Sequence, residues 1–348
     1  MITAAINPKI KVRIEGVTIT GGQAIGIYED ALGGGIYNEG NLIIRASNIA
    51  QNEVQSDIDY YSAGGGIFNS GNNAKLTLIN SKVTNNKSGT GFKSDGGGIS
   101  SDNENIVMTI KNSKITNNKI ESSSLSDNCG GGIFNAGTLI ILNSSITENE
   151  NLSNWAYGGG IYSEGNLTIA RSIIRNNLVG GGDEAGGGGI KAFANCVIIG
   201  STIAENSAEA IVVIGGGIYF CGSNLMLINS NITENRLSFH GGGEALQAFG
   251  GGIEFWGENQ KGRLINSLVS GNLAHGDLAW GGGMDMFGDG SSLLLNHSMV
   301  TSNTARTDGD AERGEGGGIR ILSDTLYKAK SSVVKGNFPD QIFVGDRN

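Results

Sequence analysis

The sequence predicts an all-β protein folded as a single-stranded, right-handed parallel β-helix of about ten to eleven coils. Ten times the chain carries three consecutive glycines followed by Ile or Met, at intervals of 28 to 35 residues. A second motif, Ser-x-(Ile/Val)-x-x-Asn, follows each copy, and apolar residues alternate with polar ones between the two motifs. A period of this length is typical of stacked repeats, and the alternation indicates strands rather than helices.

The strand before each second motif shows this alternation most clearly, as at Leu42 and Ile44 or Leu225 and Leu227. Because the side-chain period of a strand is two, one face of each of these strands points inward. A single coil cannot bury that face alone, whereas stacking makes each inward column continuous. At a strand spacing of about 4.8 Å, ten coils predict a rod roughly 50 Å long.

Both motifs are expected at turns. The asparagines of the second motif predict a ladder in which each amide donates to one neighbouring coil and accepts from the other. The glycines are expected where φ is positive or where the backbones of two coils approach too closely for a Cβ atom. A stripe of exposed N–H groups that binds anions is the alternative for the glycines.

We expect one β-helix domain over residues 1–348, with an opening half-coil at 1–32, coils at 33–337 and a C-terminal tail at 338–348. Val12, Ile14, Val17 and Ile19 match the strand columns of the later coils. The N-terminus has neither the basic region nor the apolar region of a secretion signal. We therefore expect that the chain is a truncated form of a longer protein.

Composition excludes several classes of protein. Of 348 residues, 59 are glycine and only 2 are proline, and 16% are charged, which is too few for a disordered chain. No stretch approaches 18 apolar residues, so no transmembrane segment is expected. The net charge of −9, without a visible basic face, argues against a nucleic-acid partner. Cys129, Cys196 and Cys221 lack metal-type spacing and are expected as buried thiols.

Three segments carry a family resemblance: GGGIYNEG at 33–40, LTLINSKVTNN at 76–86 and GGGIYSEGNLTIARSIIRNN at 158–177. They resemble the right-handed β-helix repeats of bacterial surface and secreted proteins, in particular those of the polymorphic outer membrane proteins. The resemblance implies the pectate-lyase-like superfamily and an extracellular or cell-surface location on a bacterium. That superfamily includes polysaccharide lyases and glycoside hydrolases as well as adhesins without catalytic activity.

The segments between each Asn and the next glycine triplet vary most in length, and function on a solenoid is expected in such variable parts. The longest, at 53–63, 119–129, 236–249 and 304–315, are expected to form a wall of loops along one edge. Aromatic side chains recur there, including Trp155, Tyr157, Phe249 and Trp280. They could stack on the sugar rings of a polysaccharide or surface glycan, or they could simply pack the loops together.

The column immediately after the conserved Ile is expected to point outward. Its second half is charged and includes Lys191, Glu254, Asp285 and Arg320. Glu254 and Asp285 fall on adjacent coils, so their carboxyl groups are expected about 5 Å apart, a separation that suits acid/base or nucleophilic work on a glycoside.

Two residues further along, Trp256 and Phe287 would flank these carboxyl groups. Arg320 and Lys191 could stabilise the developing enolate of a lyase reaction. The alternative is a ladder of charged and aromatic side chains that only stabilises the sheet.

Acidic loops make a bound Ca²⁺ possible, and no other cofactor is indicated. The clusters are Asp57 with Asp59, Asp183 with Glu184, and the run of Asp308, Asp310 and Glu312. None has the full pattern of a calcium-binding loop, and solvated acidic loops are the alternative. His240 and His275 lie in consecutive loops without a ligand spacing, so no metal site is assigned.

The sequence leaves two functions open. The first is a secreted or cell-surface β-helix that binds glycans or mediates adhesion. The second is a polysaccharide lyase or glycoside hydrolase acting on the charged face of coils 6–10. A purely structural spacer fits less well with loops of such unequal length.

Overall fold

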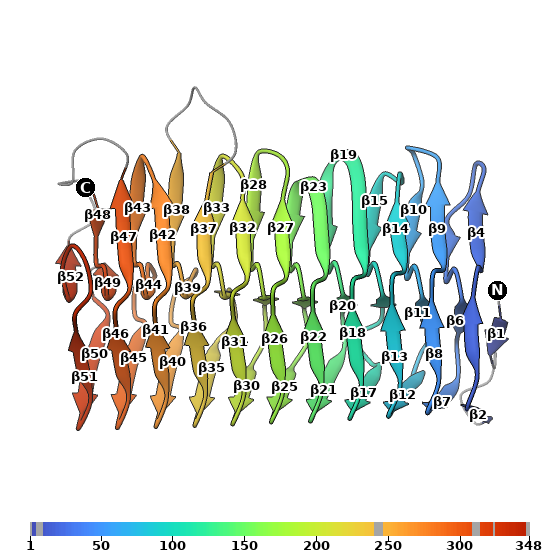
Figure 1. Ribbon diagram of the computed structural model, residues 1–348, viewed down its shortest axis with the longest axis horizontal. Coiled ribbons are helices and arrows are strands. Elements are labelled where there is room, and N and C mark those ends of the chain that lie inside the picture. The colour runs from blue at the N-terminus through green and yellow to red at the C-terminus, as the bar shows by residue number, and fades with distance from the viewer. Residues whose placement is uncertain (1, 5–9, 240–245, 308–313, 323, 346–348) are drawn as a thin grey trace.

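The computed structural model describes residues 2–4, 10–239, 246–307, 314–322 and 324–345. In these ranges the chain is all-β, without a helix, and its right-handed turns stack into a parallel solenoid of about ten coils (Figure 1). The predicted fold class is therefore confirmed. We number the coils 1 to 10 by their glycine triplets.

Four stacks of parallel strands, which we name sheets A to D, run along the rod. Sheet A begins after the glycine triplets and consists of β1 (Ile2–Ala4), β6 (Ile36–Asn38), β11 (Ile67–Asn69), β16 (Ile99–Ser101), β20 (Ile133–Asn135), β24 (Ile161–Ser163), β29 (Ile190–Ala192), β34 (Ile218–Phe220), β39 (Ile253–Phe255), β44 (Met284–Met286), β49 (Ile319–Leu322) and β52 (Ile342–Gly345).

Sheet B follows sheet A in each coil and contains the strands with the clearest alternation. It consists of β2 (Lys11–Glu15), β7 (Asn41–Arg45), β12 (Lys75–Ile79), β17 (Val107–Lys111), β21 (Thr138–Leu142), β25 (Leu167–Ala170), β30 (Cys196–Ile199), β35 (Asn224–Ile228), β40 (Lys261–Ile265), β45 (Ser292–Asn296) and β50 (Leu326–Lys330).

Sheet C lies between the Ser and the Asn of the second motif. It consists of β3 (Thr18–Thr20), β8 (Asn48–Ala50), β13 (Lys82–Thr84), β18 (Lys114–Thr116), β22 (Ser145–Thr147), β26 (Ile173–Arg175), β31 (Thr202–Ala204), β36 (Asn231–Thr233), β41 (Leu268–Ser270), β46 (Met299–Thr301) and β51 (Val333–Lys335).

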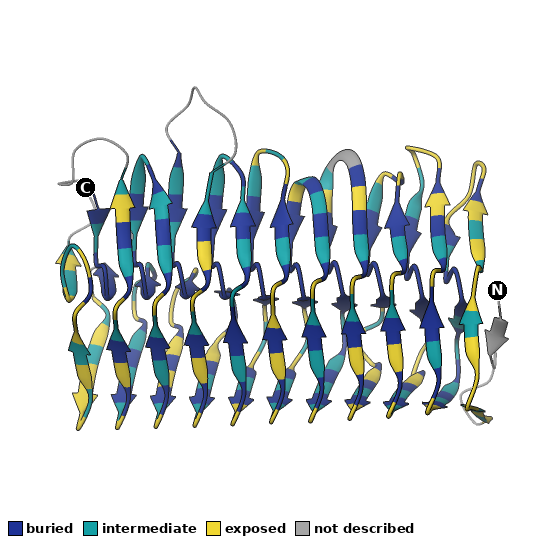
Figure 2. Ribbon diagram, viewed as in Figure 1, coloured by how far each residue is buried: buried dark blue, intermediate teal, exposed yellow. Residues whose placement is uncertain are grey.

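The main core lies between sheets A, B and C. Along the rod, each inward column stacks residues of similar size, for example Ile133 of β20, Ile161 of β24 and Ile190 of β29, which are in register and fully buried. Figure 2 shows buried and exposed residues alternating along these strands. The alternation follows from the period-2 geometry of a strand with one face in the core.

The predicted asparagine ladder is present. The Nδ2 of Asn177 donates to Oδ1 of Asn206 (2.9 Å) and to the carbonyl of Ile146 (3.0 Å), while its own Oδ1 accepts from Asn149. The ladder runs from Asn52 to Asn337, where the Oε1 of Gln341 accepts from the last amide. Buried turn groups therefore find partners where water cannot reach them.

Both expected reasons for the glycines apply. The first glycine of most triplets has a positive φ, such as +69° at Gly187. At the second and third, an added Cβ would meet a carbonyl oxygen of the next coil, at 2.5 Å for Gly188 and 2.7 Å for Gly189. A side chain at these positions would force the coils apart.

The segments between each Asn and the next glycine triplet were predicted to be loops, and the structure instead contains strands in them. Most of them form an outgoing and a returning strand, which stack along the rod into a projecting fin (Figure 1). The outgoing strands are β4 (Gln23–Gly26), β9 (Glu53–Ser56), β14 (Lys87–Gly89), β27 (Leu178–Gly180), β32 (Ser207–Glu209), β37 (Arg236–Ser238), β42 (Leu273–Gly276) and β47 (Thr304–Thr307).

The returning strands are β5 (Ala31–Leu32), β10 (Tyr61–Ala63), β15 (Lys93–Asp95), β28 (Glu184–Gly186), β33 (Val212–Ile214), β38 (Gln247–Phe249), β43 (Leu278–Trp280) and β48 (Gly314–Glu315). β19 (Lys119–Cys129) and β23 (Glu150–Tyr157) take part in both stacks and join them into sheet D.

The fin has a second, thin core made mostly of small side chains. It contains eight alanines, two valines and one leucine, including Ala156, Ala185 and Leu237. Near the N-terminus of the rod, serines and asparagines fill the same place, and Ser56 and Ser62 form a hydrogen bond of 2.9 Å between their hydroxyls. Small side chains let the two stacks approach closely, which explains why the sequence between motifs lacks long apolar runs.

The column after the conserved Ile points away from the main core, as predicted, but its charged members are buried. Among its members, Glu254 and Asp285 are 0% exposed, Arg320 4% and Lys191 6%. The reason is the fin, because side chains of its returning strands pack over this column. The outward column of sheet A and the facing column of the returning strands together form one layer of side chains. We name it the corner layer.

Candidate functional site

The corner layer brings together three of the four predicted catalytic residues. Glu254 of β39, Asp285 of β44 and Arg320 of β49 are in register on adjacent strands of sheet A. Arg320 donates two hydrogen bonds to Asp285, from Nε to Oδ1 (2.9 Å) and from Nη2 to Oδ2 (2.6 Å). This bidentate pair is buried, so the charges of Arg320 and Asp285 compensate each other in a medium of low polarity.

Glu254 is the unusual member of this group. Both of its carboxyl oxygens are buried without a partner that could donate a hydrogen bond. Burial raises the pKa of Glu254 well above its ordinary value, and the Asp285 carboxylate within hydrogen-bonding reach raises it further, against the opposing effect of Arg320. A protonated Glu254 can donate to Asp285, which gives one of its oxygens a partner and avoids a second buried negative charge.

Aromatic rings pack on Arg320 and on each other beside this group. The guanidinium of Arg320 lies 4.7 Å from the ring centre of Trp280 and 5.9 Å from that of Phe249, and these two rings stack at 4.8 Å. Trp256 and Phe287, expected to flank the carboxyl groups, stack on each other at 5.1 Å. The indole of Trp256 also contacts Phe249 edge to face, and Trp256 is 39% exposed.

Lys191, the fourth predicted catalytic residue, lies two coils away from Glu254 and contacts neither carboxylate. Its ammonium group instead sits among rings, at 3.1 Å from the centre of Tyr157 and 4.6 Å from that of Tyr219. Gly186 makes room for these rings, because a Cβ there would lie 2.7 Å from Tyr219. Burial lowers the pKa of Lys191, although Cys221 and Cys129 oppose this effect.

A second charged cluster, at coils 2 and 3, was not predicted. Asp95 accepts hydrogen bonds from the hydroxyl of Tyr61 (2.7 Å) and the backbone N–H of Cys129 (3.1 Å), and Lys93 lies 3.0 Å from its carboxylate. Burial raises the pKa of Asp95, while Lys93 and Tyr61 counteract the shift. The sequence signal was the pair Lys93 and Asp95, two residues apart just before a glycine triplet, where both side chains share one face of a strand.

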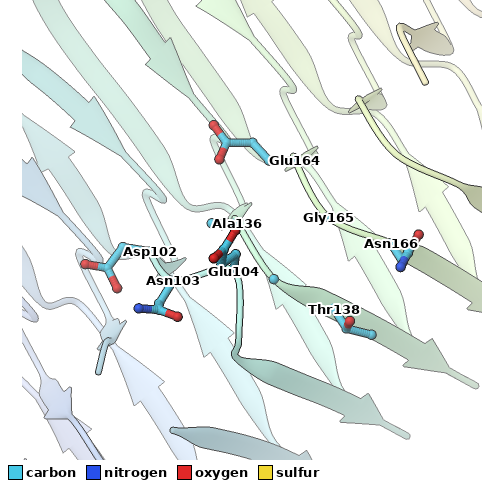
Figure 3. A pocket seen from close by; sticks show the side chains of 9 residues that line it. Asp102, Asn103, Glu104, Ala136, Thr138, Glu164, Gly165 and Asn166 are labelled. Atoms are coloured by element: carbon cyan, nitrogen blue, oxygen red, sulfur yellow. The ribbon is translucent and has the colours of Figure 1, made fainter. Parts of the chain in front are cut away.

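The turns between sheets A and B form an open, polar depression of about 560 Å³ on coils 3 to 5 (Figure 3). Asp102, Glu104 and Glu164 supply carboxylates to it, and Asn103 and Asn166 supply amides. Partial burial raises the pKa of Asp102. These groups can accept and donate hydrogen bonds to a hydroxyl-rich ligand.

The described residues provide no arrangement of side chains that supports the expected Ca²⁺ site. Within the described ranges, no group of three or more His, Cys, Asp or Glu side chains is arranged to hold a metal ion. Asp57 instead accepts a hydrogen bond from the backbone N–H of Tyr28 (3.1 Å). Asp308, Asp310, Glu312 and His240 lie outside the described residues.

The predicted ligand-binding aromatics fall into two groups by exposure. Trp155 is 36% exposed on the outer side of β23, and Trp256 is partly exposed at the edge of sheet A. Tyr157, Phe249, Trp280 and Phe287 instead pack within or against the corner layer. Phe193, which was not predicted, is 39% exposed next to Tyr162, at 5.4 Å between ring centres.

No helix in the part of the chain that the structure describes is long and apolar enough to cross a membrane. Comparisons with protein-family models, with curated proteins and with solved structures found no match to this chain. The resemblance to the repeats of polymorphic outer membrane proteins therefore gains no support beyond the β-solenoid fold itself, which is compatible with surface and glycan-binding roles.

Proposed function

We propose that the chain is a secreted or cell-surface β-solenoid that binds a glycan along the rim of the corner layer, without turnover. The observation that carries the proposal is the exposure of three aromatic side chains on strands that border the corner layer, namely Trp155 on β23 of the fin, Phe193 directly after β29 and Trp256 directly after β39. Sugar rings stack on such faces, and rigid aromatic side chains contribute contact area at a small entropic cost.

Two further features support a glycan as the ligand. The rim rests on packed side chains, since Trp256 contacts the half-buried Phe287 and Phe193 contacts the buried Tyr162. The polar depression of coils 3 to 5 adjoins it, because Glu164 directly follows β24, the strand that carries Tyr162. Carboxylates and amides there would hydrogen-bond sugar hydroxyls, as polar groups in binding sites commonly do.

Substitution of the rim aromatics tests this proposal. Glycan-array screening identifies a ligand, and titration calorimetry then measures its affinity for the wild type and for Trp155→Ala and Trp256→Ala. We expect each variant to bind about ten-fold more weakly, because truncating an aromatic contact residue commonly costs more than 1 kcal/mol.

Tyr28→Asn is the matched control. Tyr28 is 79% exposed near the N-terminus, away from the rim, and its φ of +62° suits asparagine. Unchanged affinity in both tryptophan variants, with a glycan bound, would place the binding site elsewhere.

The buried carboxyl pair favours a second candidate function, hydrolysis or elimination at a polysaccharide. A protonated Glu254 beside an ionised Asp285 has the division of roles that a general acid and its partner carboxylate need. For a substrate to reach Glu254, the side chains that cover it would have to move, since Glu254 is fully buried.

An activity screen against uronic-acid and neutral polysaccharides tests the second candidate. Turnover that is abolished by both Glu254→Gln and Asp285→Asn, in variants that remain folded, would assign the chemistry to this pair. Turnover that survives both substitutions would exclude it.

A further inference from the structure

Almost all charged residues in the strands of sheet B are positively charged. They carry nine lysines and arginines but only one acidic residue, Glu15, in a protein whose net charge is −9. The strands of sheet C add four cationic residues and no acidic one, which leaves 11 cationic and 32 acidic side chains for the rest of the chain. The nine of sheet B are Lys11, Arg13, Arg45, Lys75, Lys111, Lys261, Arg263, Lys328 and Lys330.

These cations point outward and lack compensation. All nine are exposed. Glu15 forms ion pairs with Arg13 and Arg45 only. The other seven make no ion pair with any residue in the part of the chain that the structure describes. The outer face of sheet B is therefore a positively charged surface on an acidic protein.

Between the cations, the same face is uncharged and mostly apolar. The strands of coils 4 to 7, which are β21, β25, β30 and β35, carry no charged residue at all. Their outward positions include Ile140, Leu142, Ile199 and Ile228, of which Ile199 is 37% exposed. A sheet face in water normally alternates with polar residues, and an extended apolar surface marks an interaction site.

From this pattern we propose that the outer face of sheet B docks on a lipid bilayer with anionic headgroups. The aliphatic side chains of coils 4 to 7 contact the apolar part of the interface, and the cations at both ends of the rod contact the headgroups. Apolar area and basic residues act together in this way in proteins that lie on a membrane surface.

A second copy of the chain fits this face less well. With strands of about 17 Å and ten coils of about 4.8 Å each, the face covers roughly 800 Å², which one partner contributes to a standard-size interface. Area alone would thus allow a dimer. However, both the parallel and the antiparallel pairing would bring the cationic ends of the two rods together, which costs free energy.

A soluble polyanion also fits less well, because it gains nothing from the apolar strands of coils 4 to 7. A bilayer uses both features of the face.

Cosedimentation with large unilamellar vesicles tests the proposal. We expect the full chain to bind vesicles that contain phosphatidylglycerol, to bind phosphatidylcholine vesicles much more weakly, and to dissociate as salt is added. Lys75→Gln with Lys111→Gln should weaken binding about thirty-fold, which corresponds to about 1 kcal/mol for each lysine near an anionic surface. Ile199→Thr with Ile228→Thr should weaken it as well.

Lys87→Gln with Lys119→Gln is the matched control. These two lysines lie on the same coils, but on the outgoing strands of the fin. The variant has the same change in net charge and should bind like the wild type, and circular dichroism confirms that each variant is folded.

Three results would overturn the proposal. The first is equal binding of the two lysine double variants, because it would mean that only net charge matters. The second is tight binding to heparin, with vesicle binding unaffected by the isoleucine substitutions, which would identify a polyanion as the occupant. The third is a dimer in solution that the isoleucine substitutions dissociate, which would identify a second copy.

Discussion

At the scale of single residues, the corner layer buries charged side chains whose burial the sequence alone does not predict. Asp285 and Arg320 compensate each other, and the raised pKa of Glu254 favours its neutral form. Each of these states depends on burial by the fin, so each gives the protein a measurable property.

Glu254 should make the protein less stable as the pH rises. Its pKa is raised in the folded state, so between about pH 4.5 and the raised pKa this group holds its proton more fully in the folded protein than in the unfolded chain. The contribution of Glu254 to the free energy of unfolding is fully present below about pH 4.5. It is lost progressively as the pH rises toward the raised pKa. In Glu254→Gln, unfolding by urea at a series of pH values should show a shallower loss, with the residual slope arising in part from Asp95, whose pKa is also raised.

The exposed Glu258 supplies the control for this measurement. Glu258→Gln should follow the wild-type pH dependence. Identical slopes in wild type and Glu254→Gln would contradict the protonated state of Glu254.

Removing the charge of Asp285 should strongly destabilise the fold. Asp285→Asn leaves the Arg320 guanidinium buried beside a neutral group, which we expect to cost about 3–5 kcal/mol in the free energy of unfolding. The additional change Arg320→Met should recover part of this loss, because it removes the unpaired charge. Glu205→Gln, which breaks the exposed pair with Arg175, should change the stability little, because solvent screens this pair.

At the scale of single elements, the glycine triplet and the asparagine turn determine how one coil sits on the next. The glycines allow carbonyl oxygens of the next coil to approach, and the asparagines connect three coils through one side chain. Both positions were predicted from spacing alone, because each repeats in every coil and has one physical role.

The ladder predicts that substitutions of two neighbouring asparagines, one inside the ladder and one outside it, differ strongly in their effect on the free energy of unfolding. Asn177→Ala removes the side-chain hydrogen bonds to Asn206, Ile146 and Asn149. The buried carbonyl of Ile146 and the backbone N–H of Asn149 lose the partner that Asn177 gave them, so we expect a loss of about 3–5 kcal/mol, given a cost of about 1–3 kcal/mol for each such group. Asn176 is exposed with a φ of +55°, so Asn176→Gly should change stability little. Denaturant unfolding compares the two, and equal losses would mean that the ladder does not stabilise the stack.

At the scale of the whole molecule, each coil contacts mainly its two neighbours, and the fin follows the same stacking as the main solenoid. The free energy of unfolding should therefore be approximately the sum of contributions from the single coils and from the interfaces between neighbouring coils. The same stacking sorts charge by sheet, so that one face of an acidic rod is positive.

Deletion of residues 178–206 should leave a folded protein. This segment runs from one ladder asparagine to the next, and Leu178 and Ser207 are paired in register, so Ser207 can continue directly from Asn177. We expect a solenoid shorter by about 4.8 Å, measured by small-angle X-ray scattering. Deletion of residues 178–192, about half a coil, breaks the register and should yield an unfolded chain by circular dichroism.

The sequence by itself determined the solenoid, its number of coils and the ladder of asparagines. These features repeat in every coil, and a repeated pattern of apolar, glycine and amide positions has one stacked solution. The sequence also placed Glu254, Asp285 and Arg320 on adjacent coils of one column.

Only the tertiary structure decided what surrounds that column. The fin depends on alanines and serines, which carry no recognisable strand pattern, so burial of the charged column could not be read from the sequence. The cations of sheet B are likewise scattered along the sequence from Lys11 to Lys330. They meet on one face only because the stacking of coils brings equivalent positions together.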